Sequence, residues 1–213
     1  MKTRDDLPLF LNRLGLIGVG VEVGVHQGSF SEAILRDWKG QRLYSVDPWS
    51  FQPDAKLDKS NVGQPEHDRC RQMTIDRLRK FGKRSVILHT FSPQVTKTHH
   101  FSDIELDFVY LDARHDYRSV TADLKAWFPL IKHGGVIAGH DYKDSCVRKN
   151  LVEVKRAVDA FFHADVIKTT TDDNLPSWWV VRDVFSCQTN GICYNCGMVE
   201  YNCCCSHDEL DDR

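Results

Sequence analysis

The sequence predicts an α/β fold, with a Rossmann-like, doubly wound sheet of seven mostly parallel strands, an antiparallel last strand, and helices on both faces. Short apolar runs alternate with helical patterns at a regular pitch, as in a parallel sheet that is covered on both sides. Two of these runs, 108–117 and 134–142, each lead into a carboxylate and a histidine. Because the ligand crevice of such a sheet lies beyond the carboxyl ends of its strands, these polar residues would meet there.

Size and composition suit one domain with a small appendage. The chain has 213 residues, of which 41% are hydrophobic and 27% are charged. The formal net charge of −2 argues against nucleic acid as the main partner, which usually binds to a basic face. The most apolar stretch, 14–25, is short and contains Glu22. We therefore expect no secretory signal, no membrane span and a cytoplasmic location.

The first elements follow from periodicity and capping. Apolar residues at helical spacing predict a helix at 5–14, and a short apolar run predicts the first strand at 19–25. The next helical pattern, 29–38, would begin with Ser29 or Ser31 as its N-cap.

The middle of the chain continues the alternation. A second strand at 42–46 ends at Asp47, and a polar stretch without periodicity follows at 50–64. A connection of that length in a compact domain is usually a lid or a binding loop. A basic amphipathic pattern predicts a helix at 66–81, and the run 85–89 predicts the third strand.

The last part of the domain carries the strands with the polar ends. Strands are predicted at 106–111 and 136–138, and helices at 117–131 and 151–162. The chain would close with two strands joined by a turn near Asn174, and these strands are 166–170 and 178–182.

The turn after the first strand indicates a nucleotide-like cofactor. Gly24 and Gly28 lie where that strand becomes a helix, and glycine there permits positive φ and a close approach of ligand to backbone. The G-x-G-x-x-G spacing of a nicotinamide site is absent. Asp47, about 20 residues further on, has the place of an acid that binds ribose hydroxyls. Together these residues favour a cofactor that contains a nucleoside.

Two carboxylates and two imidazoles follow the two polar-ended strands. Asp112, His115, His140 and Asp141 together could hold a divalent metal ion or move a proton. The alternative is that the acids cap the helices that follow. We favour capping for Asp116, which opens a helical pattern, and a chemical role for Asp112 and Asp141.

With these motifs in order, the chain resembles the class I S-adenosylmethionine-dependent methyltransferases, and among them the methyltransferase-24 type. The resemblance extends over about 14–182, and the segments that carry it are 22–30, 44–49, 111–117 and 134–142. The sequence departs from the family pattern at Ala113-Arg114, where the family usually has a glycine and a small or polar residue. That departure leaves the shape of the acceptor pocket open.

The resemblance implies a role for each matched position. The residues implied to bind the cofactor are Glu22, Gly24, Gly28, Ser29, Asp47, Trp49, His89, Ser92 and Asp112. The residues implied to hold Mg²⁺ or Mn²⁺ are Asp112, His140 and Asp141. His115 is implied to be the general base, and Asp112 and Asp141 complete the catalytic set.

The implied reaction is transfer of a methyl group from S-adenosylmethionine to a hydroxyl of a sugar, such as a glycan or a rhamnose-type deoxysugar. The cofactor carries an activated methyl group, and a divalent ion can lower the pKa of the acceptor hydroxyl. The partner would be a small molecule or glycan, with no nucleic acid and no membrane; the chain could also be a module of a larger enzyme. A nicotinamide oxidoreductase and a non-enzymatic, metal-organised interaction module remain as alternatives, because similar sheets host many functions.

A cysteine-rich tail follows the domain. Apolar periodicity stops at Asp183, so we place the domain at 1–183 and the tail at 184–213. The tail residues that could bind a metal are Cys187, Cys193, Cys196, Cys203, Cys204, Cys205 and His207. This pattern is compatible with a tetrahedral zinc site, and disulfides or a disordered tail are the alternatives.

Overall fold

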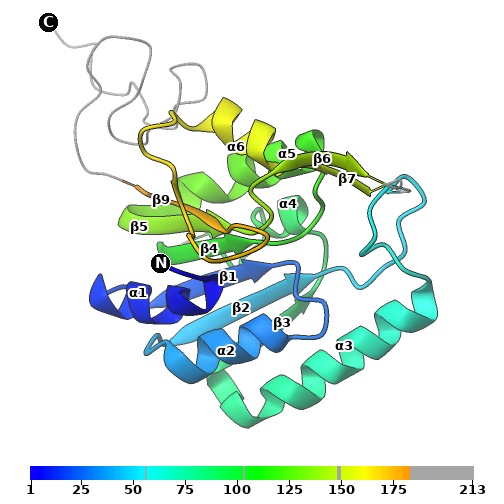
Figure 1. The fold of residues 1–213 in the computed structure, drawn as a ribbon. Helices are drawn as coiled ribbons and strands as arrows, with labels where there is room; N and C mark the ends of the chain where they lie inside the picture. The colour runs from blue at the N-terminus through cyan, green and yellow to red at the C-terminus, as the bar shows by residue number, and fades with distance from the viewer. Residues whose placement is uncertain (56, 103, 148–149, 183–213) are drawn as a thin grey trace, which may run out of the picture.

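The predicted fold class is confirmed by a computed structural model that describes residues 1–182, apart from 56, 103 and 148–149. Seven strands form one sheet in the order β3-β2-β1-β4-β5-β9-β8 (Figure 1). The first five strands in this order, β3, β2, β1, β4 and β5, run parallel to one another, whereas β9 is antiparallel to β5 and β8 is antiparallel to β9. The strands are β1 (Val19–Val23), β2 (Arg42–Asp47), β3 (Ser85–His89), β4 (Leu106–Leu111), β5 (Ile131–Gly139), β8 (Lys168–Thr169) and β9 (Trp178–Val181).

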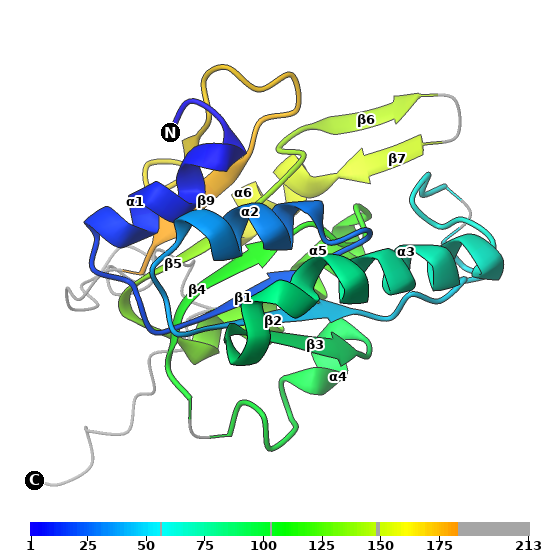
Figure 2. The same ribbon diagram turned by 90° about the horizontal axis from the view of Figure 1, so that it is seen from below.

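Helices cover both faces of the sheet (Figures 1 and 2). One face carries α1 (Leu7–Arg13), α2 (Ser29–Asp37) and α3 (Gln64–Leu78). The other face carries α4 (Ser92–Val95), α5 (Tyr117–Trp127) and α6 (Val154–Phe161). Short 3-10 turns complete the chain at Arg4–Asp6, Arg79–Arg84 and Phe128–Leu130.

Side-chain alternation along the strands divides the core into two layers. In β4, Phe108 and Tyr110 pack in the cluster that contains α1 and α2, while Val109 and Leu111 pack in the cluster that contains α5 and α6. Successive side chains of a strand point to opposite faces, so one buried strand contributes to both clusters. Each large apolar side chain removed from water in this way contributes about 1.5–3 kcal/mol.

Several predicted element boundaries were wrong. The predicted helix 151–162 is present as α6, but it begins only at Val154, because residues 151–153 belong to β7 (Asn150–Glu153), which forms an antiparallel hairpin with β6 (Asp144–Val147). Apolar Leu151 and Val152 extend the helical pattern in the sequence, but the backbone amide of Leu151 instead donates to the carbonyl of Leu57 at 2.9 Å. Pairing across the hairpin, of Cys146 with Leu151 and of Ser145 with Val152, holds this segment as a strand together with the contact to the loop after β2.

Two other helix ends also differ. The predicted helix 117–131 ends at Trp127, because Pro129 lies in a 3-10 turn and Ile131 already starts β5. The N-cap of α2 is Gly28, with φ at +73°, and neither predicted serine caps the helix. Ser31 is instead buried and donates a hydrogen bond to Glu22 of β1.

The strand order reverses at β1, which pairs with β2 on one side and with β4 on the other. The connections that follow β1 and β4 therefore go to opposite faces of the sheet and leave a crevice beyond the carboxyl ends of these two strands. No helix in the described part of the chain combines the length and the apolar character that a membrane span requires.

Candidate active site

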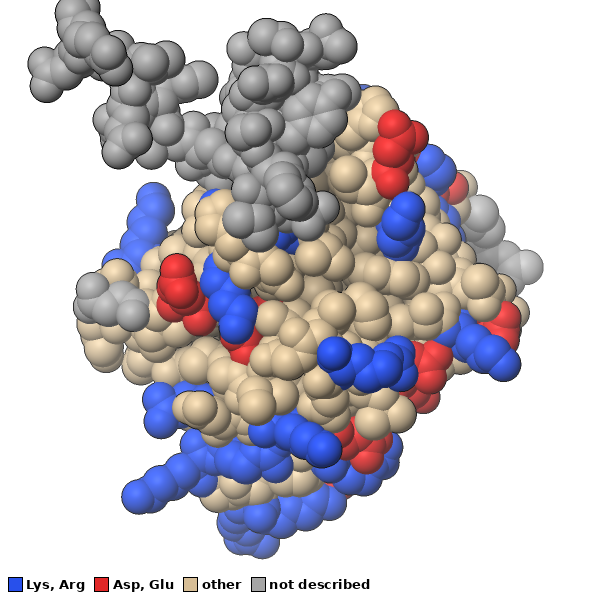
Figure 3. All heavy atoms as spheres, turned by 90° about the vertical axis from the view of Figure 1, so that its left-hand side faces the viewer, with Lys and Arg blue, Asp and Glu red and all other residues tan. Residues whose placement is uncertain are grey.

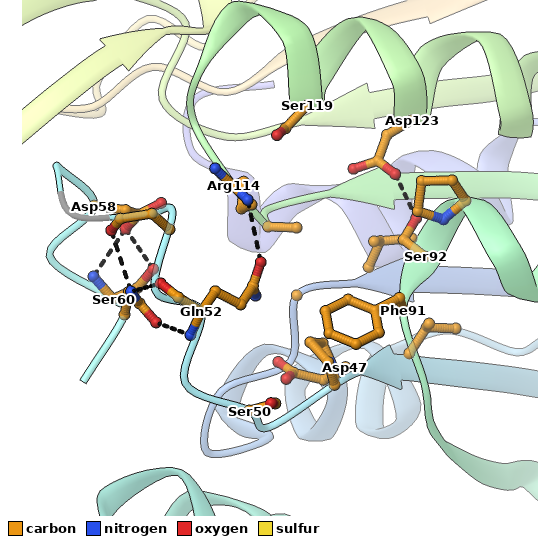
Figure 4. A pocket seen from close by; sticks show the side chains of 18 of the residues that line it. Asp47, Ser50, Gln52, Asp58, Ser60, Phe91, Ser92, Arg114, Ser119 and Asp123 are labelled. Carbon is orange, nitrogen blue, oxygen red and sulfur yellow. Dashed lines mark hydrogen bonds between the residues drawn. The ribbon is translucent and has the colours of Figure 1, made fainter. Parts of the chain in front are cut away.

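A cavity of about 580 Å³ lies beyond the carboxyl ends of β1, β2 and β4. Its walls come from the turn after β1, the end of β2, the loop that follows β2, the start of α4, the segment after β4 and the first turns of α5 (Figure 4). This volume is typical of a site for a small molecule or cofactor. The cavity lies where the strand order predicts a ligand site.

Gly24 brings the ends of β1 and β4 together at the floor of this cavity. Its φ is +87°, and a Cβ atom there would lie 2.0 Å from the carbonyl oxygen of Asp112. The glycine is therefore required for packing of strand against strand, in addition to lining the cavity. Gly28 has a similar role, because a Cβ atom there would lie 3.0 Å from Thr74 of α3.

Asp47 organises the turn that forms one wall. Its Oδ2 accepts hydrogen bonds from the backbone amides of Val25 at 2.8 Å and His26 at 3.0 Å, and its Oδ1 accepts from Trp49 at 2.7 Å. These bonds hold the carboxylate in place at the cavity wall, where Oδ1, which accepts only one of them, keeps lone-pair capacity. The predicted contact between Asp47 and a ribose is compatible with this placement.

Of the other residues implied to bind the cofactor, some line the cavity and others do not. Trp49 and Ser92 line the cavity, as does Asp112. The cavity lining does not include Glu22, Gly28, Ser29 or His89. His89 contacts the carbonyl of Pro48 at 2.8 Å. Cofactor contact through these four residues stays a prediction.

The wall beside α4 contains a carboxylic acid that sequence reasoning missed. Ser92 donates to Asp123 of α5 and accepts from the indole of Trp127 at 2.7 Å, as Figure 4 shows for the first pair. Burial raises the pKa of Asp123 to about 6. The only signal in the sequence is the helical spacing of Asp123 and Ser119, which places both on the cavity side of α5.

The acids and imidazoles predicted at the ends of β4 and β5 do meet. His115 Nε2 lies 3.1 Å from Asp141 Oδ2 and 3.8 Å from Asp112 Oδ1. His140 Nδ1 lies 3.5 Å from Asp141 Oδ2 and 3.9 Å from Asp112 Oδ1. Asp116, in contrast, caps α5 by accepting from the amide of Ser119, as predicted.

A third carboxylate, which the sequence did not reveal, completes the surroundings of His115. Asp58 Oδ2, from the loop after β2, lies 3.2 Å from His115 Nδ1. Burial alone would lower the pKa of His115, but hydrogen bonds to Asp112, Asp141 and Asp58 outweigh burial and raise that pKa to about 12. In this arrangement the imidazole is the cation that the acids require.

The backbone at Asp141 is also unusual. Asp141 has φ at +53°, in the left-handed region that non-glycine residues seldom adopt. The conformation aims its carboxylate at His115, at the end of the buried strand β5. Backbone strain of this kind is concentrated at functional sites.

A family model described as a methyltransferase domain matches residues 21–142, which is more than half of the chain. The chain belongs to this methyltransferase family. It is an S-adenosylmethionine-dependent enzyme that transfers methyl groups. No curated protein matches the sequence significantly.

Solved structures share the fold of this methyltransferase. An O-methyltransferase from Bacillus cereus in complex with SAH is 14% identical with a TM-score of 0.58, covering 83% of this chain and 79% of that chain. The O-methyltransferase TomG from Streptomyces achromogenes, in complex with SAM, is 15% identical with a TM-score of 0.54, covering 84% and 79%. An rRNA methylase from Streptococcus thermophilus is 13% identical with a TM-score of 0.51, covering 84% and 96%. The expected absence of a nucleic-acid partner therefore stays a prediction.

The donor set in the methyltransferase fits a divalent cation. Asp112, His115 and Asp141 each offer one ligand atom, and these atoms lie within 4.8 Å of one another. Carboxylate oxygens suit Mg²⁺ and Mn²⁺, and Mn²⁺ also accepts imidazole. The trio contains His115 in place of His140, whose role as a metal ligand stays a prediction.

Arg4, which lies outside the matched region, reaches Asp112 from the N-terminal segment. Its Nη1 donates to Asp112 Oδ2 at 3.3 Å, and its guanidinium lies 4.9 Å from the centre of the Phe30 ring. The contact directs the second oxygen of Asp112 away from His115. Arg4 thereby neutralises part of the negative charge at the site.

Glu22 gives the methyltransferase a stability that depends on pH. Burial raises the pKa of this carboxyl to about 8, so the fold favours the protonated form. The contribution of Glu22 to stability is therefore fully present below the ordinary pKa of a glutamate, and it is lost as pH rises through the raised pKa of the folded state. We expect the free energy of unfolding of the wild type to fall by at least about 1 kcal/mol more than that of Glu22→Gln between pH 5 and pH 8, measured by urea denaturation.

A control separates this effect from general changes in charge. Lys80 and Arg77 lower the pKa of Glu32, so its stabilising contribution is constant in the neutral range. Glu32→Gln should therefore follow the wild-type slope between pH 5.5 and pH 8. Parallel slopes for wild type and Glu22→Gln would show that Glu22 is ionised in the fold.

The cysteine-rich tail lies outside the described residues. The predicted zinc site and the boundary at Asp183 both fall there, and they stay predictions. Within the described part, Cys70 is buried and Cys146 is exposed, and both are free thiols.

Proposed function

We propose that this methyltransferase transfers the methyl group to a hydroxyl of a sugar, on a glycan or a deoxysugar, with the help of Mg²⁺ or Mn²⁺. The observation that carries the proposal is the trio Asp112, His115 and Asp141 at the ends of β4 and β5. Asp112 also lines the cavity, so the trio lies beside the space that we assign to the methyl donor. A poor nucleophile such as an aliphatic hydroxyl needs this combination of charge and proton acceptor.

Each residue of the trio has a defined task. When bound, S-adenosylmethionine supplies an activated methyl group, and a divalent ion would lower the pKa of the acceptor hydroxyl. Asp112 and Asp141 would hold that ion and thereby orient the hydroxyl. His115 would stay outside the ligand set and would take the hydroxyl proton on Nε2, which requires the imidazole to be neutral at that moment. A divalent ion at the two carboxylates would add positive charge next to His115 and would thereby favour the neutral form of its imidazole.

The distribution of charge supports a small acceptor over a nucleic acid. Figure 3 shows lysine and arginine side chains gathered at the lower edge of the face that it draws. Among the exposed cations of the fold are Arg79, Lys80 and Lys83 in the turn Arg79–Arg84, which precedes β3, at the opposite end of the sheet from the cavity. None of these cations lines the cavity. A basic surface so far from the methyl donor would not present a nucleic acid for reaction.

Oxygen as the acceptor atom is supported by the structural neighbours described as O-methyltransferases, and a sugar is supported by the resemblance in the motifs. The purified enzyme should be incubated with S-adenosylmethionine and free or nucleotide-linked deoxysugars, a catechol, or RNA, with Mg²⁺ or excess chelator. We expect the mass of the sugar to rise by one methylene group only without chelator. Exclusive methylation of RNA or catechol would reject the sugar assignment, and full activity in chelator would reject the metal.

Asp47 provides a test of the donor site. We expect Asp47→Ala to weaken binding of S-adenosylhomocysteine at least tenfold, since loss of a charge-assisted contact costs about 1.5–3 kcal/mol. Isothermal titration calorimetry measures this directly. Asp37→Ala is the matched control, because Asp37 ends α2 and pairs with Arg36 far from the cavity. Equal affinity in the two variants would contradict the assignment of Asp47 to the ribose.

A further inference from the structure

The loop 50–63 lies between β2 and α3, and its described residues, 50–55 and 57–63, form the outer wall of the cavity. Gln52, Asp58 and Ser60 of this loop face the space between β2 and α5 (Figure 4). The loop is therefore positioned to cover the methyl donor. One side chain of the loop, Asp58, also contacts His115, so the loop can influence the proposed catalytic residues as well as cover the cavity.

The loop is folded upon itself by local hydrogen bonds. The amide group of Asn61 donates to the carbonyls of Gln52 at 2.6 Å and Ala55 at 3.2 Å, and its oxygen accepts from the amide of Gln52 at 2.8 Å. Asp58 Oδ1 accepts from Ser60, from the backbone amide at 2.8 Å and from the hydroxyl at 2.6 Å. These bonds fix the carboxylate of Asp58 so that its Oδ2 points out of the loop, toward His115, as a hydrogen-bond acceptor.

The loop is joined to the rest of the fold mainly by polar contacts. Arg114 Nη1 donates to Asp54 at 2.9 Å and to Gln52 at 3.2 Å, and the carbonyl of Leu57 accepts from Leu151 of β7. The large apolar side chains of the loop contribute little, since Phe51 is 49% and Leu57 is 41% exposed. A segment with few buried apolar contacts opens at a low cost in free energy.

Asp58 determines which nitrogen of His115 faces the reaction. The two ring nitrogens point in opposite directions, Nδ1 toward Asp58 at 3.2 Å and Nε2 toward Asp141 at 3.1 Å. A carboxylate at Nδ1 keeps a proton on that nitrogen and fixes the plane of the ring. Nε2 is then directed at Asp112 and Asp141. Because Asp58 belongs to the loop, its contact with His115 depends on the position of the loop.

We propose that Asp58 is a positioning residue that links closure of the loop 50–63 over the methyl donor to the orientation of His115. The inference rests on the proposed function, in which His115 acts at Nε2. Closure encloses the donor and aligns the imidazole in the same movement. Methyl transfer is thereby restricted to the state in which the cavity is covered.

The first test observes the ring of His115 directly. In protein labelled with ¹⁵N at histidine, we expect wild type and Asp58→Asn to show a hydrogen-bonded Nδ1 proton on His115, since the asparagine oxygen can still accept. Asp58→Ala should lose that signal, with resonances assigned through His115→Gln. Persistence of the signal in Asp58→Ala would overturn the proposal, whether or not an acceptor for the enzyme has been found.

The second test separates positioning from binding of the donor. We expect Asp58→Ala to lower kcat by about 10- to 100-fold, while calorimetric affinity for S-adenosylhomocysteine changes less than threefold; Asp58→Asn should restore most of kcat. Lys59→Ala, an exposed neighbour that does not line the cavity, is the control and should remain within twofold of wild type. An unchanged kcat in Asp58→Ala would contradict the proposal. Absence of methyl transfer to hydroxyls in the wild type would instead contradict the proposed function.

Discussion

Asp141→Asn is expected to lower turnover by about 10²- to 10³-fold and to leave binding of the methyl donor intact. The carboxylate lies 3.1 Å from His115 and does not line the donor cavity. In the proposed metal-assisted reaction, loss of one charged ligand would remove several kcal/mol of stabilisation. Asparagine has the same shape and tolerates the φ of +53° at this position, so the variant tests the charge and not the backbone.

Three measurements decide the outcome. Turnover is followed as product formation, donor affinity by calorimetry with S-adenosylhomocysteine, and metal affinity by titration of Mn²⁺ under electron paramagnetic resonance. Asp144→Asn is the matched control, because Asp144 is exposed on β6 and accepts from the amide of Arg156, away from the cluster. Turnover of Asp141→Asn within a factor of five of that control would remove Asp141 from the catalytic set.

Gly24→Ala is expected to destabilise the fold by at least about 4 kcal/mol, which is exceptional for one added methyl group. The Cβ atom would lie 2.0 Å from the carbonyl oxygen and 2.4 Å from the carbonyl carbon of Asp112. Both atoms belong to the backbone at the end of β4, so a side-chain rotation cannot relieve the clash. The cost of φ at +87° adds to the clash.

Gly15→Ala isolates the part of this cost that comes from backbone conformation. Gly15 has φ at +71°, and a Cβ atom there would meet no other atom within 4 Å. Its substitution should therefore cost only about 1–2 kcal/mol. Urea denaturation of both variants gives the comparison. Equal losses of stability would show that β1 and β4 separate without cost, and that Gly24 is required for its φ alone.

Local pattern predicted the sheet well, because strand and helix periodicities depend on neighbours a few residues apart. The strands at 42–46, 85–89 and 106–111 were predicted almost to the residue. The strand before α6 was missed, since Leu151 pairs with Cys146 across a short hairpin and its amide donates to Leu57, which is distant in the sequence. Ser31 was misjudged as a cap because its buried partner, Glu22, lies on another element.

The meeting of Asp112, His115 and Asp141 followed from the sequence alone. Parallel strands that end in polar residues place those residues at one edge of the sheet, whatever the details of packing. The sequence also indicated the helix cap at Asp116, whose partner is three residues away. In both cases either chain topology or local spacing was enough to define the neighbours.

Only the tertiary structure identified Asp58, Asp123 and Arg4 as parts of the site. Each is an ordinary polar residue in its own segment, and each acquires its role from a partner far along the chain. It also changed the meaning of Gly24, which the sequence assigned to ligand approach and which the structure shows to be packed against Asp112. Folding brought these distant groups within hydrogen-bond or van der Waals distance, and at such short range burial and charge determine their chemistry.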